Sequence, residues 1–281
     1  MSFEQRVLKF TFSGDQVGTL GIQGLRAAAN IQVASGKTGV NAQVKIWGLT
    51  LAQMDNYSSR ISAGPALGKF NAVIEAGVLG GPLSTVINGP IIRSYVDLGS
   101  VPESAFVVSI AGLYEAANPN PGQSFKGPYN AEDVISALCA GTYTVVNNGA
   151  HAVLRNPNVT ADSIINQVLE IANHAGFRVS LATTSNTISI WPKNGTIDNQ
   201  VIDLGPSTDP ELVGYPTFTE TGLIVTSLYN PEIFVGRNIN LKSSIPKANG
   251  LWQIVYAWHD LTTMIPKGPW FTSAMLASAG T

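Results

Sequence analysis

Hydrophobic residues at every second position recur in the first and last parts of the chain. This spacing restricts the fold most, because it is typical of a β-strand with one buried face. Near the N-terminus, Leu8, Phe10 and Phe12 are separated by single polar residues. The same alternation recurs at Ile31/Val33, Val44/Ile46, Phe106/Val108/Ile110, over 223–228, at Ile239/Leu241 and along Trp252/Ile254/Tyr256/Trp258. For the N-terminal part, short strands with glycine-rich turns between them predict a small barrel or sandwich.

Local signals add turns and one short helix to the N-terminal part. Gly80-Gly81-Pro82 and Gly89-Pro90 are predicted as turns between strands, since glycine and proline interrupt regular structure. Residues 50–55 predict a short helix with Thr50 as its N-cap.

The middle of the chain changes to helical spacing. A helix is predicted over 131–140, preceded by Asn130 and stopped by Gly141. A second helix is predicted to begin after a Thr160 cap and to end at Gly176. Its apolar stripe is Ile164, Ile165, Val168, Leu169 and Ala172. A hairpin is then predicted from the alternation of Phe177/Val179/Leu181 and of Ile188/Ile190, which completes an α/β unit over roughly 123–195.

The segment Asn118-Pro119-Asn120-Pro121-Gly122 predicts the first boundary, because two prolines and a glycine continue neither a helix nor a central strand. We therefore expect a β-rich domain over 1–118, an α/β domain over 119–195 and a second β-rich domain over 196–281. The predicted fold class is mainly β with an α+β organisation.

Charge is scarce in this chain of 281 residues. Lys and Arg number 16 and Asp and Glu 18, so charged residues make up 12%, about half of the usual ~25%. Hydrophobic residues make up 44%, which excludes a disordered chain, and no apolar run reaches the length of a membrane span. Basic residues are scattered, so no specific nucleic-acid binding is expected. Because low surface charge lowers solubility, we expect other protein to cover much of the surface.

Catalytic chemistry finds little support in the sequence. The histidines are His151, His174 and His259, and no motif pairs His259-Asp260 with a nucleophile. The one cysteine, Cys139, lies on a predicted helix and is expected to be a buried hydrophobic residue of a protein that folds in a reducing cytoplasm. No metal-ligand spacing occurs in the sequence. We therefore expect no catalytic, cofactor-binding or metal-binding residues and no enzymatic activity.

Aromatic residues gather near the C-terminus. Trp252, Tyr256 and Trp258 are predicted to share one strand face, with Trp270 and Phe271 following. A packed core or a subunit interface is the favoured interpretation, and a carbohydrate-binding platform of exposed rings is the alternative. The predicted structural or interface residues are Trp47, Trp252, Tyr256, Trp258, His259, Trp270 and Phe271.

The order of several short motifs resembles the baseplate hub proteins of contractile-tailed bacteriophages, in a short form. In the C-terminal part these are GYPTF (214–218), GLIVTSLYNP (222–231), GRNINL (236–241), GLW (250–252), HDL (259–261) and PKGPWF (266–271). Earlier segments that resemble the family are NAQVKIWGL (41–49), VIEAG (73–77), INGPI (87–91) and AGF (175–177).

This resemblance implies a homotrimer at the centre of a tail baseplate. Each chain would carry two barrel-like tube domains, so that three chains present six domains in a pseudo-sixfold ring. The ring would adapt a sixfold tail tube to a threefold central spike and surround the channel for DNA. Implied partners are the spike, the tail tube or tube-initiator protein and baseplate wedge proteins. The implied locations are the virion and, during assembly, the host cytoplasm.

Neutral strand residues such as Asn238 and Asn240 are compatible with a channel for DNA. Three alternatives remain open from the sequence. One is the equivalent hub of a contractile bacteriocin or injection particle. Another is a carbohydrate-binding β-protein that uses Trp252, Trp258 and Trp270. The last is a hydrolase that acts through Cys139 or His259.

Overall fold

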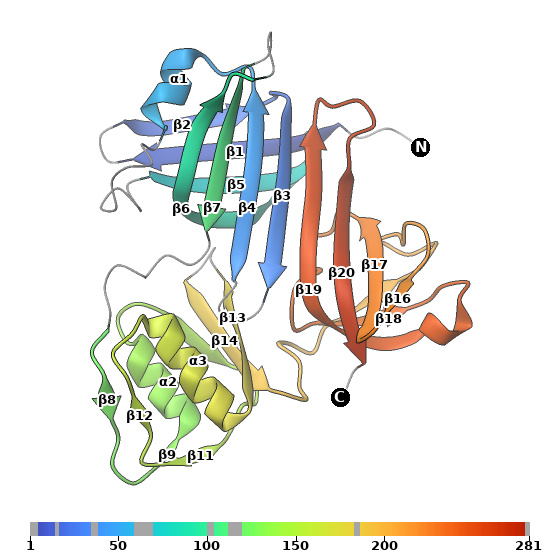
Figure 1. Cartoon of the computed structure of the whole chain (residues 1–281). Coiled ribbons are helices and arrows are strands. Elements are labelled where there is room, and N and C mark those ends of the chain that lie inside the picture. The colour runs from blue at the N-terminus through green and yellow to red at the C-terminus, as the bar shows by residue number, and fades with distance from the viewer. Residues whose placement is uncertain are drawn as a thin grey trace.

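A computed structural model describes residues 5–14, 17–34, 39–58, 70–99, 104–111, 120–182 and 186–278. Asn118 and Pro119 of the predicted boundary lie outside these residues. The architecture is mainly β, with one large antiparallel sheet and a smaller α/β part below one half of it (Figure 1).

The N-terminal β part contains seven strands and one short helix. These are β1 (Arg6–Gly14), β2 (Gly18–Gln23), β3 (Ala27–Ala34), β4 (Val40–Trp47), α1 (Leu51–Asn56), β5 (Phe70–Val78), β6 (Leu83–Asp97) and β7 (Ala105–Ala111). The alternation at Leu8, Phe10 and Phe12 is confirmed, since all three side chains are buried in β1. Thr50 caps α1 as predicted, in a capping box with Gln53.

Strand β6 is long because it belongs to two layers. Its first half pairs with β5, and its second half pairs with β7 after a register shift between Ile91 and Arg93. In Figure 1, β1, β2 and β5 run across the back of the upright strands β6, β7, β4 and β3. The predicted turn at Gly89-Pro90 is therefore wrong: both residues lie inside β6, where the strand passes from one layer to the other.

The α/β part packs two helices against a three-stranded sheet. Its elements are β8 (Gln123–Ser124), β9 (Pro128–Asn130), α2 (Ala131–Cys139), β10 (Thr144–Asn147), β11 (Val153–Arg155), β12 (Asn158–Val159), α3 (Ile164–Ala175), β13 (Phe177–Ala182) and β14 (Thr187–Pro192). Both predicted helices and the hairpin are confirmed, and Gly176 ends α3 in the left-handed conformation. The predicted Thr160 cap is wrong, because the Ser163 hydroxyl accepts the hydrogen bond from Asn166 N.

The C-terminal β part continues the large sheet. Its elements are β15 (Val201–Leu204), β16 (Thr217–Thr219), β17 (Gly222–Leu228), β18 (Asn238–Leu241), the one-turn helix η3 (Pro246–Ala248), β19 (Gly250–Thr263) and β20 (Trp270–Ser278). Strand β19 pairs with β3 from Tyr256↔Ala34 to Thr263↔Ala27. One continuous sheet therefore joins residues that lie more than two hundred positions apart in the sequence.

Buried side chains form three hydrophobic clusters. The first lies under β1–β7, the second inside the α/β part and the third under β15–β20. Leu261 of β19 and Trp270 of β20 belong to the first cluster and so hold the two β parts together. These clusters support the division into domains at 1–118, 119–195 and 196–281, which we propose on this basis.

Candidate functional site

The large sheet has one open face, which is turned toward the viewer in Figure 1. The register places Asp260, Asn30, Gln43 and Ser109 in one row across β19, β3, β4 and β7. Their neighbours along each strand, such as Ile31 and Val108, point into the core. The open face is thus a polar surface made largely of uncharged amide and hydroxyl groups.

Lys45, Asp97 and Asp260 on this face have hydrogen-bond partners, and Arg93 of β6, which pairs with Ser109, lies over the Tyr95 ring. Lys45 Nζ lies 2.8 Å from Asp97 Oδ2, and this hydrogen bond lowers the pKa of Asp97. Asn30 Nδ2 donates to Asp260 Oδ1 at 2.6 Å. A hollow of about 370 Å³ lies over Lys45, Asp97 and Asp260. Because the two cations Lys45 and Arg93 are balanced by Asp97 and Asp260, the face carries little net positive charge.

One lateral edge of the sheet is the second half of β6, which we call the β6 edge (91–98). Within the part of the chain that the structure describes, these residues pair with β7 on one side and with no strand on the other. Ile92 and Leu98 are exposed, Leu98 to 61%. Arg93 is also exposed, with its guanidinium group 4.7 Å from the centroid of the Tyr95 ring. The edge therefore combines apolar side chains with one cation.

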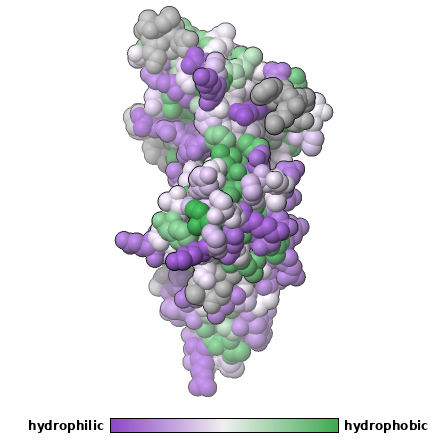
Figure 2. All heavy atoms as spheres, turned by 90° about the vertical axis from the view of Figure 1, so that its right-hand side faces the viewer, coloured by the Kyte–Doolittle hydropathy of each residue, from purple (hydrophilic) through white to green (hydrophobic). Residues whose placement is uncertain are grey.

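The opposite lateral edge is formed by residues 211–220, which we call the β16 edge. Leu228 N donates to Glu211 O, so this segment lies beside β17. Tyr215 is 73% exposed and Phe218 is 53% exposed, and Glu211 and Glu220 are exposed carboxylates. Figure 2 views the molecule from this side and shows hydrophobic side chains, in green, among hydrophilic ones. This edge combines apolar side chains with anions.

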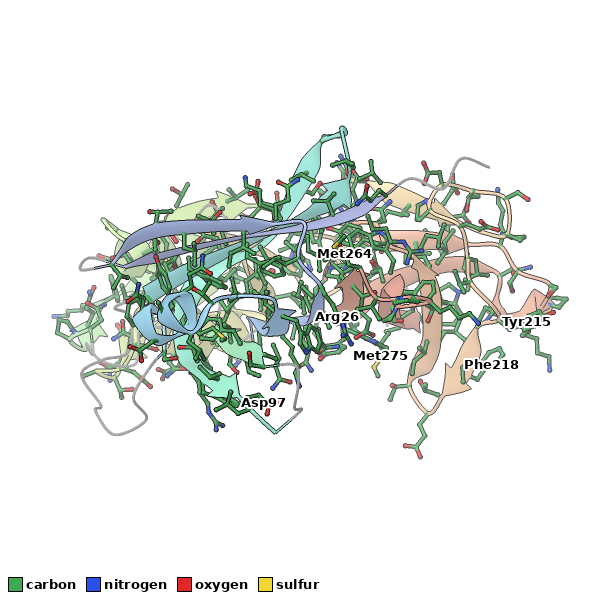
Figure 3. The ribbon with its side chains drawn as sticks, turned by 90° about the horizontal axis from the view of Figure 1, so that it is seen from above. Arg26, Asp97, Tyr215, Phe218, Met264 and Met275 are labelled. Carbon is green, nitrogen blue, oxygen red and sulfur yellow. The ribbon has the colours of Figure 1, made fainter. Side chains whose placement is uncertain are left out.

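Seen from above, the sheet runs between these two edges. Figure 3 shows Asp97 near one end and Phe218 and Tyr215 near the other, with Arg26 and Met275 between them. The two edges thus lie at opposite ends of the same open face.

The predicted common face of Trp252, Tyr256 and Trp258 is wrong. A register shift between Ile254 and Tyr256 adds one residue to β19. Ile254 and Ala257 consequently both enter the third cluster. Trp252 packs against that cluster and donates its Nε1–H to Ala248 O at 2.8 Å. Tyr256 and Trp258 lie on the open face, with ring centroids 5.8 Å apart.

The remaining aromatic candidates are also divided between core and surface. Trp47 is half-buried beneath the Arg26 guanidinium, which lies 4.6 Å from its ring centroid. Phe271 is half-buried and pairs with Asp260 on the open face. Trp270 is buried, with 7% of its surface exposed, and its ring centroid lies 5.4 Å from that of Tyr229. The exposed platform that a carbohydrate-binding role for Trp270 requires is therefore contradicted.

His259 is buried at the join of the two β parts. Its Nδ1 lies 2.8 Å from Thr272 Oγ1, and its ring meets the edge of the Tyr229 ring. Burial lowers the pKa of His259 from 6.5 to about 4, because the charged imidazolium loses its hydration. His259 is thus a neutral structural residue.

This burial predicts a pH-dependent stability. Between pH 6.5 and 4 the unfolded chain binds a proton at His259 that the folded chain does not, so stability falls as the pH falls through this window. The loss over the whole window is about 3 kcal/mol, from the shift in pKa. Chemical denaturation at pH 7 and pH 4.5 measures it. His259→Gln is the control and should flatten this dependence, whereas an equal loss in the variant would assign the effect to other groups.

The cysteine and the other two histidines lie in the α/β part and not beside His259. Cys139 is fully buried in α2. His151 Nδ1 lies 2.5 Å from Glu132 Oε1 at the surface of the α/β part, and His174 lies exposed in the last turn of α3. Within the described ranges, no three His, Cys, Asp or Glu side chains gather as a metal would require. Nor does any described helix combine the length and apolarity that crossing a membrane demands.

The two lateral edges escaped sequence-based prediction. Glu211 and Glu220 were isolated acidic residues in the sequence, and Arg93 was one scattered cation among others. The exposed aromatic residues Tyr215 and Phe218 were visible only as part of the GYPTF motif. Knowing that they lie on an edge requires the strand order.

Comparison with known proteins identifies what the chain is similar to. The family model described as "Baseplate hub gp41" matches residues 136–264. No curated protein sequence matches this chain significantly. The family match bears out the predicted resemblance to baseplate hub proteins, which form a structural family without enzymatic activity.

Solved structures share the fold at low sequence identity. The 43 kDa tail protein of prophage MuSo2 from Shewanella oneidensis has a TM-score of 0.65 at 8% identity, over 96% of this chain and 97% of that chain. The Escherichia coli c3393 protein, a type VI secretion component, has a TM-score of 0.61 at 9% identity, over 91% and 74%. A tail protein from Neisseria meningitidis has a TM-score of 0.58 at 13% identity, over 97% of both chains.

Proposed function

We propose, from the match to baseplate hub proteins, that three copies of this chain form a ring at the centre of a phage tail baseplate. The ring adapts a sixfold tail tube to a threefold spike and surrounds the channel through which DNA passes. The observation that carries this proposal is the single sheet that runs through both β parts. Among the described residues, stretches of its β6 edge and of its β16 edge have a strand partner on one side only.

The geometry of the edges supports a ring. An uncovered sheet edge favours pairing with another chain, and the two edges here are different surfaces. Contact between the β6 edge of one copy and the β16 edge of the next is head-to-tail. Such contacts close into a ring when the rotation from one copy to the next divides a full turn into a whole number of steps. With two β parts in each copy, a threefold ring holds six β parts.

Charge supports this pairing of unlike edges. The β6 edge carries Arg93, and the β16 edge carries Glu211 and Glu220. Apolar side chains accompany them on both edges, with Leu98 on one and Phe218 on the other. Two copies of the same edge would instead place like charges together, which disfavours a twofold dimer through either edge.

Charge reversal tests the ring. Arg93→Glu should weaken self-association at least tenfold, because it places a carboxylate opposite Glu211 and Glu220; Glu211→Lys with Glu220→Lys should do the same. Combining all three substitutions in one chain should restore association, since the edges become complementary again. Light scattering over a concentration series measures this.

The matched control is Arg155→Glu, which reverses an exposed cation of the α/β part and should leave association unchanged. Loss of association in that control, or failure of the combined variant to recover, would argue against these edges.

The open face supports the role as a channel. Asn30, Gln43 and Ser109 in the middle of its row are neutral, Asp260 at one end is acidic, and Arg93 at the β6 edge is the cation of the row. A polyanion slides past such a surface without the phosphate contacts that cations make. In the proposed ring this face lines the lumen, and its polar side chains keep the channel surface hydrated.

Relatives support the proposed partners. The Escherichia coli c3393 protein is described as structurally similar to the T4 tail proteins gp27 and gp5, and another similar structure is a Francisella PdpA–VgrG complex. We propose that the spike and the tail tube or tube-initiator protein contact this ring, with wedge proteins around it. The protein would reside in the virion and, during assembly, in the host cytoplasm. A contractile bacteriocin or injection particle is the close variant, which the neighbouring genes would distinguish.

A further inference from the structure

The three parts of the chain enclose a cavity where they meet. Its volume is about 210 Å³, and it lies beside the β13–β14 hairpin and the lower ends of β3 and β4 (Figure 1). Apolar side chains from all three parts form most of its wall, namely Val33, Val40, Val86, Leu181, Ile197 and Phe234. A molecule bound in this cavity would therefore touch all three parts at once.

Part of the wall is held in place by contacts between the α/β part and the C-terminal β part. Trp191, at the end of β14, is fully buried, and a Cβ atom on Gly236 would lie 2.8 Å from its ring. Ile197 N donates to Gly236 O at 2.9 Å, and Arg237 Nε donates to Asp198 Oδ2 at 2.7 Å. The cavity is therefore bordered by packed elements and is formed before a ligand arrives, as most small-molecule sites are.

Polar groups are few in the cavity, and one of them has an unpaired atom. The polar side chains that line it are Thr85, Ser180, Ser189 and His259, and none of the described lining residues carries a charge. His259 is only 3% exposed, and its Nδ1 lies 2.8 Å from Thr272 Oγ1. No described residue is hydrogen-bonded to its Nε2. Because a buried nitrogen without a partner costs free energy, a ligand that bonds to Nε2 would gain affinity.

We propose that this cavity binds a small neutral molecule that is about the size of one aromatic ring and carries a hydroxyl group. An apolar cavity of about 150 Å³ holds benzene, so the larger volume here suits a ring with one or two substituents. The hydroxyl group pairs with Nε2 of His259. Because a hydroxyl group both donates and accepts, it fits either tautomer of the imidazole. The bound molecule stabilises the junction of the three parts, since only the folded chain forms the site.

The probe that tests this site is p-cresol, and toluene, which lacks only the hydroxyl group, is its matched control. Both are titrated into the full chain, and binding is followed by saturation-transfer NMR and by the ¹⁵N signals of the histidine rings. We expect p-cresol to bind saturably and about fivefold or more tightly than toluene, because of the added hydrogen bond. It should shift the Nε2 signal of His259 and leave those of His151 and His174 unchanged.

Substitutions locate the binding. His259→Phe keeps a ring but removes the nitrogens, so p-cresol should bind it as weakly as toluene does. Ser189→Leu fills the cavity from β14, where the neighbours Ile188 and Ile190 point to the opposite face, and should abolish binding of both probes. This second variant decides the matter even where His259→Phe does not fold. The control, His174→Phe, replaces an exposed histidine of α3 and should bind both probes as the wild type does.

Three results would overturn the proposed site. These are no saturable binding of p-cresol to the wild type, equal affinity for p-cresol and toluene, and unchanged p-cresol binding by folded Ser189→Leu. The site does not depend on the proposed ring, because every residue that lines it comes from one chain. A monomeric chain that binds p-cresol in this way would contradict the ring and leave the site standing.

Discussion

Replacing Gly222 with valine is expected to unfold the C-terminal β part. A Cβ atom at this position would lie 1.8 Å from the carbonyl oxygen of Leu276 on β20, far inside contact distance. Backbone of a central strand cannot move aside without opening the pairing of β17 with β20. The cost should exceed about 3 kcal/mol, the upper end of ordinary overpacking. Chemical denaturation of Gly222→Val against wild type measures it.

Gly21→Val is the matched control for this prediction. Gly21 also lies in a strand, β2, but nothing is within 4 Å of a Cβ atom built there. The control should change stability by less than about 1 kcal/mol, as surface substitutions do. If both variants lowered the free energy of unfolding equally, the loss in Gly222→Val would not come from the contact with Leu276.

A second large effect is expected for genome passage. Asn30→Lys with Gln43→Lys would add two cations per chain to the neutral row of the open face. In the proposed ring these six ammonium groups would line the channel and bind the phosphates of passing DNA. Phage carrying the variant should assemble normally but eject DNA at least tenfold more slowly. Time-resolved DNA release from purified particles measures this.

The control for the channel prediction is Asn30→Ala with Gln43→Ala, which removes the same amides without adding charge. It should eject DNA at the wild-type rate. If the lysine variant also ejects at that rate, the open face of this sheet does not line the channel.

Local structure was largely predictable from the sequence because local rules decide it. The alternation of Leu8, Phe10 and Phe12 predicted β1, and Gly176 marked the end of α3. Thr50 formed the capping box at α1 that its position indicated. In each of these cases the hydrogen bonds or the burial involve residues within a few positions of one another.

Long-range features escaped prediction because contacts distant in sequence decide them. The extra residue of β19 between Ile254 and Tyr256 moves Trp252 and Trp258 to opposite sides of the sheet, and no residue type in that segment signals a bulge. Gly89-Pro90 has the composition of a turn, yet β6 continues through it because separate partners, β5 and β7, hold its two halves. The pairing of β3 with β19 has no local signal at all.

The candidate surfaces depended on the same long-range pairing. The open face could be assigned only after the register placed Asn30 beside Asp260. Likewise, His259 carried no sign of burial in the sequence, since its neighbour Asp260 is polar and lies on the open face. Its burial follows from the packing of Tyr229 and Thr272 around it.

The mass of the wild-type particle in solution tests the central claim most directly. Light scattering should be recorded for the purified chain alone and after mixing with the spike protein of the same phage. The ring predicts that, with the spike, this chain contributes three times its own mass of 29.6 kDa. A chain that stays at its single mass in both samples would contradict the claim that three copies close into a hub.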